Sequence, residues 1–280
     1  MMQNPRSEAV EQALLGLFRD EPDNSAVLGA MYAYYSGRNR LEDFISRLEE
    51  QRKRDPSNRQ VADLLVTLYG ESKRTADALR VLDELRQAVA GDADQLYMAA
   101  HLYERVERPE MTEQLLQEVL KLDSQHGPAS NDLGYMWADA GRNLDQAESL
   151  IRIAVDVEPD NSAYLDSLGW VLYKRGKFDE AKRYLKAATE AVDDPDAVVL
   201  DHYADVLYRL DQQEQAVKIW TDVLEQIKGV RAGREDLKKL QLHLQQKLRQ
   251  QKEGVPVSVA PAITTGSATS ATRPAAQIAR

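Results

Sequence analysis

One spacing recurs along most of this 280-residue chain. Large apolar side chains return every 34 or 35 positions, at Tyr35, Tyr69, Tyr103, Trp137, Leu172 and Leu207. The hexapeptide EPDNSA stands at 21–26 and returns at 158–163, which is four periods of 34 plus one residue further on. A chain with this period is predicted to be a linear array of similar units, each of which buries its apolar faces against its neighbours.

Two more registers indicate what each unit contains. Apolar residues occupy Leu14, Leu48, Leu82, Leu116, Ile151, Leu185 and Trp220, and small ones occupy Ala78, Thr112, Ala147, Ala181 and Ala216. Apolar residues spaced 3, 4 and 7 apart around these points predict helices, and small residues at fixed points predict close helix contacts. Each unit is therefore expected to be a helix pair, with a turn such as Gly176 and Lys177 between its helices.

Gly169 stands in the middle of one predicted helix, where glycine costs about 0.5–1 kcal/mol relative to alanine. A close contact that leaves no room for a Cβ atom would explain it. We expect Ala181 of the following helix to be its partner in that contact.

The residues then resemble a known family. The pattern small-x-x-Leu-Gly-Trp/Tyr, followed by Gly-x-x-x-x-Ala and by Pro near the end of the unit, resembles the tetratricopeptide repeat, whose period is 34 residues. The best copies are 127–160 and 162–195, and weaker ones begin near residues 25, 59, 93 and 197. The unit at 25 departs from the pattern with Tyr32 and Phe44 at the small positions, and the unit at 59 departs with Val66. The resemblance implies an all-α, right-handed superhelical solenoid of helix-turn-helix repeats.

The resemblance also divides the chain. Residues 25–230 are predicted to hold six repeats, and residues 1–24 an orphan second helix of a partial repeat. Residues 231–253 are predicted to form a capping helix, because Leu237, Leu240, Leu244 and Leu248 make one apolar stripe. Residues 254–280 contain no acidic residue and few large apolar ones, and are expected to be disordered. The partial repeat suggests that the chain is a fragment of a longer protein or has a divergent start.

Composition narrows the possible partners and locations. The net charge of −10 opposes nucleic-acid binding, which needs Lys and Arg against phosphates. No run approaches the length of a membrane span, and residues 1–24 lack the apolar core of a signal peptide. With no Cys, the chain has neither disulfides nor thiolate chemistry. The expectation is a soluble chain, cytoplasmic or periplasmic. A weaker likeness to bacterial tetratricopeptide adaptor proteins favours a bacterial origin.

No motif predicts catalysis. The four histidines make no ligand pair at helical spacing, so each is expected to be a surface or groove residue and not a metal ligand. Phosphate-binding loops and nucleophile elbows are also absent from the sequence. The acidic loops EPDN and DPSN are interpreted as turn and helix-cap sequences, not as calcium loops. The sequence thus predicts a protein that is not an enzyme and that has no cofactor and no metal.

The resemblance implies a concave groove lined by the first helix of each repeat. Carried over position by position, the groove residues are Asp63, Thr67, Tyr97, His101, Glu104, Arg105, Asn131, Tyr135, Asp139, Asp166, Trp170, Tyr173, Lys174, Asp201, Asp205, Tyr208 and Arg209. Aromatic side chains among hydrogen-bonding ones suit a peptide-binding surface. The alternative for Trp170 and Tyr135 is packing against the neighbouring repeat, and Tyr35, Tyr69 and Tyr103 are expected to be structural.

The residue types in this groove predict the partner. Arrays that clamp a C-terminal carboxylate use Lys and Asn, and only Asn131 fits that pattern. Five aspartates, Asp63, Asp139, Asp166, Asp201 and Asp205, would repel an acidic tail, so a basic or aromatic-rich protein segment is expected. The predicted function is a non-catalytic protein–protein interaction scaffold or adaptor. The alternatives are a recognition arm of a larger enzyme or envelope complex truncated upstream, and a self-assembling module that pairs through its N-terminal helix.

Overall fold

The computed structural model describes residues 5–229 and 235–262. Within those ranges the chain forms fourteen α-helices and no strand. The helices are α1 (Pro5–Asp20), α2 (Ser25–Ser36), α3 (Leu41–Arg54), α4 (Arg59–Glu71), α5 (Thr75–Ala88), α6 (Ala93–Arg105), α7 (Pro109–Leu122), α8 (Gly127–Asp139), α9 (Leu144–Val157), α10 (Ser162–Lys174), α11 (Phe178–Glu190), α12 (Ala197–Arg209), α13 (Gln213–Gln226) and α14 (Glu235–Glu253). The even-numbered helices from α2 to α12 begin at the six residues where the 34-residue period places its repeat starts.

Side-chain caps set the start of most of these opening helices. The Oδ1 atom of Asn24 accepts from the backbone N–H of Ala26 (2.9 Å), and that of Asn161 accepts from Ala163 (3.0 Å). An Asn or Asp caps α4, α6 and α12 in the same way. These oxygens satisfy N–H groups that the first helical turn leaves without a partner. The interpretation of the two EPDNSA copies as turn and cap sequence is confirmed.

Each helix pair turns through a residue at positive φ, and these residues follow the same period: Asn39, Lys73, Glu107, Gly141, Gly176 and Asp211. Glycine adopts this conformation at no steric cost, whereas other residues do so under strain. Four of the six turns therefore place a non-glycine residue in a conformation that favours glycine.

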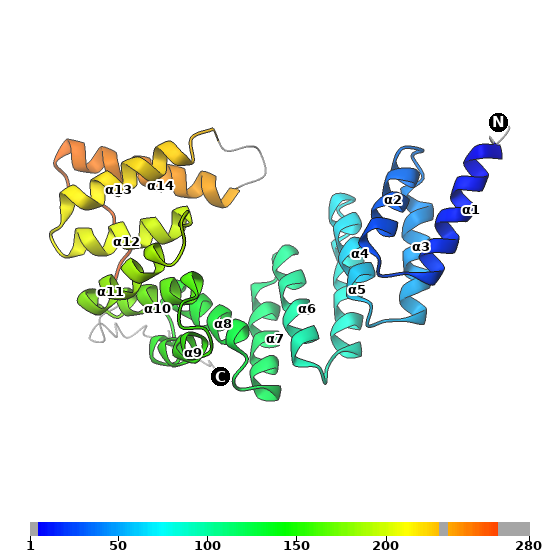
Figure 1. Cartoon of the computed structure of the whole chain (residues 1–280), viewed down its shortest axis with the longest axis horizontal. Helices are drawn as coiled ribbons and strands as arrows, with labels where there is room; N and C mark the ends of the chain where they lie inside the picture. Colours follow the sequence, from blue (N-terminus) through cyan, green and yellow to red (C-terminus); the bar gives the residue numbers. More distant parts are fainter. Residues whose placement is uncertain (1–4, 230–234, 263–280) are drawn as a thin grey trace, which may run out of the picture. The chain divides into compact units, whose positions relative to one another are not determined.

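The chain separates into two compact units, residues 1–129 and 130–280, which are called unit 1 and unit 2. In unit 1, consecutive helices pack as antiparallel neighbours (Figure 1). Tyrosine hydroxyls on three opening helices donate to carboxylates on the preceding helix: Tyr35 to Glu11 (2.9 Å), Tyr69 to Glu49 (2.7 Å) and Tyr103 to Asp83 (2.6 Å). All three rings are buried, so their expected structural role is confirmed. Phe44, one of the departures from the repeat pattern, stacks on Tyr35 at 5.5 Å.

In unit 2, α10 and α11 approach each other closely at Gly169. A Cβ atom at Gly169 would lie 2.5 Å from Cγ of Leu185, so no larger residue fits without movement. The expected close contact is present, but its partner is Leu185 and not Ala181. The leucine branches of α11 fill the space that Gly169 leaves, while Ala181 is buried elsewhere along the same helix.

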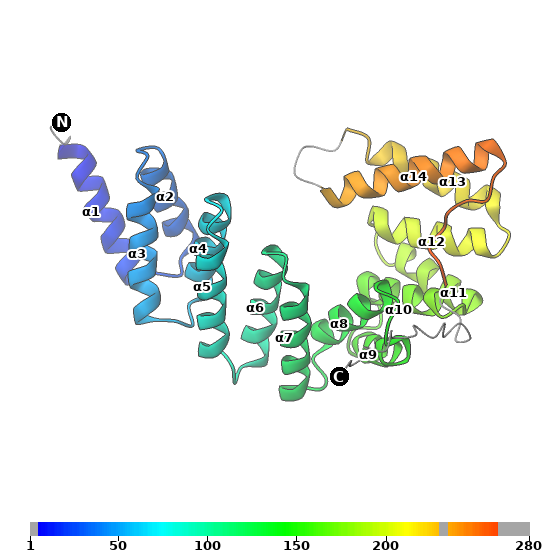
Figure 2. The ribbon, with the colours of Figure 1, turned by 180° about the vertical axis from the view of Figure 1, so that it is seen from behind.

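The last helix and the residues after it complete unit 2. Helix α14 packs beside α13, and the four leucines of its apolar stripe join a core cluster around Trp220. Residues 254–262, named the strap here, follow α14 without helix or strand and cross α12, as Figure 2 shows from behind. These nine residues belong to the tail that is expected to be disordered, and in the structure Val257 lies buried in the same cluster. The remainder of the expected disordered tail lies outside the described residues.

Candidate functional site

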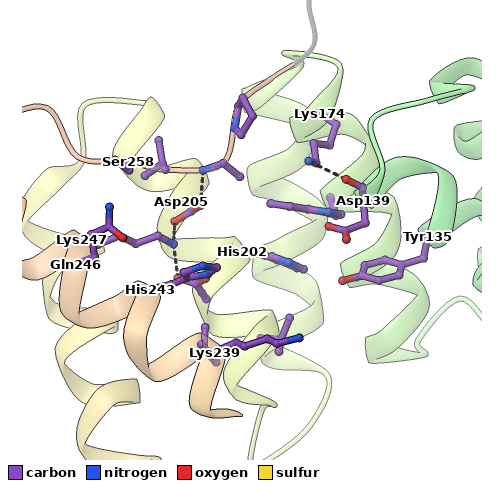
Figure 3. A pocket seen from close by; sticks show the side chains of 17 residues that line it. Tyr135, Asp139, Lys174, His202, Asp205, Lys239, His243, Gln246, Lys247 and Ser258 are labelled. Carbon is purple, nitrogen blue, oxygen red and sulfur yellow. Dashed lines mark hydrogen bonds and ion pairs between the residues drawn. The ribbon is translucent and has the colours of Figure 1, made fainter. Parts of the chain in front are cut away.

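A pocket of about 640 Å³ opens within unit 2. Its walls come from α8, α10, α12, α14 and the strap (Figure 3). The lining residues are Tyr135, Asp139, Trp170, Lys174, Val198, Asp201, His202, Asp205, Lys239, Leu240, His243, Gln246, Lys247, Ser258, Val259, Ala260 and Pro261. Six of them are among the groove residues that the repeat pattern predicts: Tyr135, Asp139, Trp170, Lys174, Asp201 and Asp205.

An aromatic stack forms the base of this pocket. The Trp170 indole lies between Tyr173, with ring centroids 5.1 Å apart, and His202, at 3.9 Å. Only 4% of Trp170 is exposed, and its indole nitrogen has no hydrogen-bond partner among the described residues. Most of the Trp170 ring is thus used for packing. This agrees with the alternative in which Trp170 packs against the neighbouring repeat.

His202 is itself held by a buried carboxylate. Its Nδ1 atom lies 3.0 and 3.1 Å from the two carboxylate oxygens of Asp166. Burial acts to lower the pKa of His202, but Asp166, with smaller contributions from Asp201 and Asp205, raises it above its ordinary value. Asp166, a predicted groove residue, therefore lies beneath the pocket as the partner of His202.

Two further predicted acids share one lysine of α14. Nζ of Lys247 lies 2.7 Å from Oδ1 of Asp201 and 2.5 Å from Oδ1 of Asp205, and all three side chains are buried. Helical spacing places the two acids on one face of α12, one turn apart, so a single ammonium group reaches both. Lys247 is not among the predicted groove residues, although the sequence held a signal: it stands three residues after Leu244, on the apolar stripe of a predicted capping helix.

The strap is held through its backbone by groove side chains. The N–H of Ala260 donates to Oδ2 of Asp205 (3.1 Å). The carbonyl of Ala260 accepts from Nη2 of Arg209 (2.9 Å) and from the hydroxyl of Tyr173. Burial raises the pKa of Tyr173 to about 12. Three side chains predicted to bind a peptide in the groove therefore bind a peptide group of this chain.

The far wall of the pocket carries Lys174, Asp139 and Tyr135. Nζ of Lys174 donates to the backbone carbonyl of Asp139 (3.2 Å) and lies 5.1 Å from the centre of the Trp170 ring. Burial lowers the pKa of Lys174, which the Asp139 charge partly opposes. Burial, assisted by Asp139, Asp166 and Asp196, raises the pKa of Tyr135. Tyr135 is half-buried and is labelled at the edge of the pocket in Figure 3.

Two predicted groove residues of unit 2 lie elsewhere. Tyr208 packs towards Trp220, with ring centroids 5.5 Å apart, and so belongs to the core beneath α13. Asn131 is buried, and its amide nitrogen contacts Asp132 at 3.2 Å. Neither lines the pocket. The repeat position alone could not predict this, because packing against the neighbouring helices sets the direction of each side chain.

The groove residues predicted in unit 1 form two separate groups. Arg105 pairs with Asp63 and donates to Thr67 (2.6 Å), beside a shallower pocket of about 350 Å³ that Tyr32 also lines. Tyr97 packs instead against His101 and His126, with centroids 4.7 and 5.0 Å away.

These contacts change the expected charge of the groove. Of the five aspartates, Asp63 pairs with arginine, Asp166 with histidine, and Asp201 and Asp205 with lysine, while Asp139 stays exposed. The electrostatic reason to expect a basic partner is therefore largely removed. Among the described residues no group of three or more His, Asp or Glu is placed to hold a metal ion. No helix of the described part of the chain has the length and hydropathy to cross a membrane.

Comparison with known proteins finds relatives that align with part of this chain and with a smaller part of their own length. No family model matches the chain. It is 29% identical over 170 residues to a TPR repeat-containing protein of Pseudomonas aeruginosa, an alignment that covers 58% of this chain and 28% of that protein. It is 23% identical over 194 residues to the human protein O-mannosyl-transferase TMTC1, which covers 68% of this chain and 21% of that protein. The chain thus spans less than a third of the length of either relative.

Solved structures show the same fold. A tetratricopeptide repeat protein from Parabacteroides merdae is 17% identical with a TM-score of 0.54, over 85% of this chain and 92% of that chain. MamA from Desulfovibrio magneticus RS-1 is 18% identical with a TM-score of 0.50, over 61% of this chain and 94% of that chain. These likenesses agree with the 34-residue helix pairs and the repeated caps. The chain has the all-α tetratricopeptide-repeat fold.

Proposed function

We propose that this protein is a non-catalytic interaction scaffold that binds an extended segment of a partner protein in the unit 2 pocket. One observation carries the proposal: Tyr173, Arg209 and Asp205 hold both the backbone N–H and the backbone C=O of Ala260. Side chains that pair with backbone N–H and C=O groups bind extended chains with little dependence on sequence, and neighbouring apolar surface supplies the selectivity.

The charge and shape of the pocket favour an uncharged or weakly charged segment over a basic one. Lys247 pairs with both aspartates of α12 and offsets part of their charge, and the Trp170 stack offers an apolar base. The exposed side chains Lys239, His243 and Gln246 of α14 face the open part of the pocket (Figure 3). These are the groups that a bound segment would contact without disturbing the core.

A selection from a displayed library of random peptides tests this function. The test variant is His243→Ala with Gln246→Ala, and the matched control is Leu242→Ala with Gln245→Ala. The control residues are exposed on the same helix but do not line the pocket. We expect selected peptides to bind the wild type and the control equally and the test variant about tenfold more weakly, a loss typical of contact residues. Equal binding to all three chains would place the interaction outside this pocket.

A second candidate function is self-assembly through α1. Val10 and Leu17 are 48% and 50% exposed, and helical spacing places them on one face. Such a face suits a helix from a second copy of the chain. Sedimentation tests the candidate: a dimer that Leu17→Asp converts to monomer supports it, and a wild-type monomer at the highest concentration measured rejects it.

A further inference from the structure

The strap has the features of a bound ligand. It begins at Gly254, whose φ is +68°, and continues to Ala262 without helix or strand. Two prolines flank its central part, at positions 256 and 261, and a proline disfavours helical conformation in the residue before it. The strap is thus biased towards an extended form before it contacts the groove.

Few contacts hold the strap. Val257 is its one buried side chain among the described residues, and Ala260 contributes the backbone bonds to α10 and α12. Ser258 adds bonds to Gln250 of α14, through its N–H (2.8 Å) and its hydroxyl (2.9 Å). Most of its other residues are exposed. A segment with so little buried area belongs to the least stable part of a structure, which opens without global unfolding.

The groove groups that hold the strap are also those available to a partner. Tyr173, Asp205 and Arg209 lie at repeat positions that the tetratricopeptide pattern assigns to ligand contact, and the strap satisfies all three. A partner segment that bonded to them would have to displace Ala260. Because the strap is joined to α14 within the same chain, it competes at an effective concentration on the order of millimolar.

We infer that residues 255–261 are an internal ligand that occupies part of the groove and competes with the partner. The partner segment has the chemistry of the strap: an extended, uncharged stretch with a branched aliphatic residue three positions before a small residue, followed by proline. This inference rests on the proposed function and adds its regulation, since a partner gains access by releasing the strap.

The test uses a fluorescently labelled peptide, GVPVSVAPA, which copies residues 254–262. Its binding is measured by anisotropy against three full-length chains. In the strap-released chain, Val257→Ser removes the buried anchor and Ala260→Pro removes the N–H that donates to Asp205. In the matched control, Val255→Ser and Ala262→Pro make the same changes where Val255 is exposed and the Ala262 N–H makes no bond to described residues. Circular dichroism checks that helicity is equal in all three chains.

We expect the peptide to bind the strap-released chain at least about tenfold more tightly than the wild type and the control. In the ligand control, the seventh and eighth residues of the peptide, Ala and Pro, are exchanged. The exchange removes the N–H that matches the one Ala260 donates to Asp205, so this peptide should bind more weakly. Equal or weaker binding to the strap-released chain overturns the inference and makes the strap a fixed wall of the pocket. Binding to none of the chains overturns it as well.

The two proposals fail in different ways. Library peptides that depend on His243 and Gln246 but bind equally with and without strap release would leave the proposed function standing and reject the internal ligand. The absence of any pocket-dependent library peptide on both the wild-type and the strap-released chain would reject the proposed function itself.

Discussion

Nζ of Lys247 in α14 lies 2.5 Å from Oδ1 of Asp205 in α12, and both side chains are buried. Burial acts to lower the pKa of Lys247, but Asp205 and Asp201 raise it above its ordinary value. The last helix is thus joined to the last repeat by a charged contact as well as by its leucine stripe. That contact also forms one wall of the candidate site.

Lys247→Met should destabilise unit 2 by about 3 kcal/mol, because it leaves Asp201 and Asp205 buried without their cation. Urea unfolding followed by circular dichroism measures the loss. Lys239→Met is the control, since Lys239 is exposed on the same helix and should change stability by no more than about 0.5 kcal/mol. Equal effects of the two substitutions would contradict the structural role of Lys247.

The stability of unit 2 should fall as pH rises through the neutral range. His202 has its pKa raised above 6.5 in the folded state, against burial, by Asp166, Asp201 and Asp205. The stabilisation is therefore fully present below the unfolded pKa of 6.5 and is lost as pH rises through the higher folded value. Urea midpoints measured from acidic to alkaline pH should show this decline.

The decline in stability with rising pH is assigned to His202 only if replacing that residue removes it. His202→Gln should flatten the pH dependence above neutrality, whereas His243→Gln, on the exposed face of α14, should leave it unchanged. A slope that persists in His202→Gln would assign the titration to another group.

Gly169→Ala should destabilise unit 2 by about 1–3 kcal/mol, because its Cβ would meet Leu185. The cost should shrink when Leu185 is first replaced by Ala. In that background the two side-chain contacts are gone and alanine favours a helix, but the backbone N of residue 185 still lies 3.1 Å from the added Cβ. A double-mutant cycle of unfolding free energies measures the coupling, and additive effects would contradict the contact.

Glu107→Gly should stabilise unit 1 by roughly 0.5–1 kcal/mol, because Glu107 turns the α6–α7 pair at a φ of +57°. Glu107→Ala keeps the strained backbone and should show no such gain. The reverse change in unit 2, Gly176→Ala, should destabilise by about 1 kcal/mol. Thermal unfolding of the three variants measures these changes in stability. If Glu107→Ala stabilised unit 1 as much as Glu107→Gly, the effect would come from loss of the Glu107 side chain and not from its backbone conformation.

Much of the fold followed from local rules that operate within one repeat. The period placed the tyrosines, the small residues and the caps, because a cap such as Asn161 bonds to N–H groups only two or three residues away. The same logic indicated a tight contact at Gly169. It did not identify Leu185 as the partner, because helix rotation within the pair decides which side chain faces the gap.

The candidate site was predicted only in part for a related reason. The repeat pattern selected Tyr135, Trp170, Lys174 and Asp205, but it treated each acid as an open charge. Which aspartates stay charged towards solvent depends on partners far away in the chain: Asp166 is matched by a residue 36 positions later and Asp205 by one 42 positions later.

Local sequence patterns are enough to predict a solenoid of helix pairs, because helix periodicity, turns and N-caps depend on near neighbours. The groups that the groove presents depend instead on packing between distant segments. The tertiary structure brought α14 and the strap, which the repeat pattern does not describe, against α10 and α12, and it paired the predicted acids with Lys247 and His202. Burial of a charge is tolerated only with a partner, and partners from distant segments become visible only once the chain has folded.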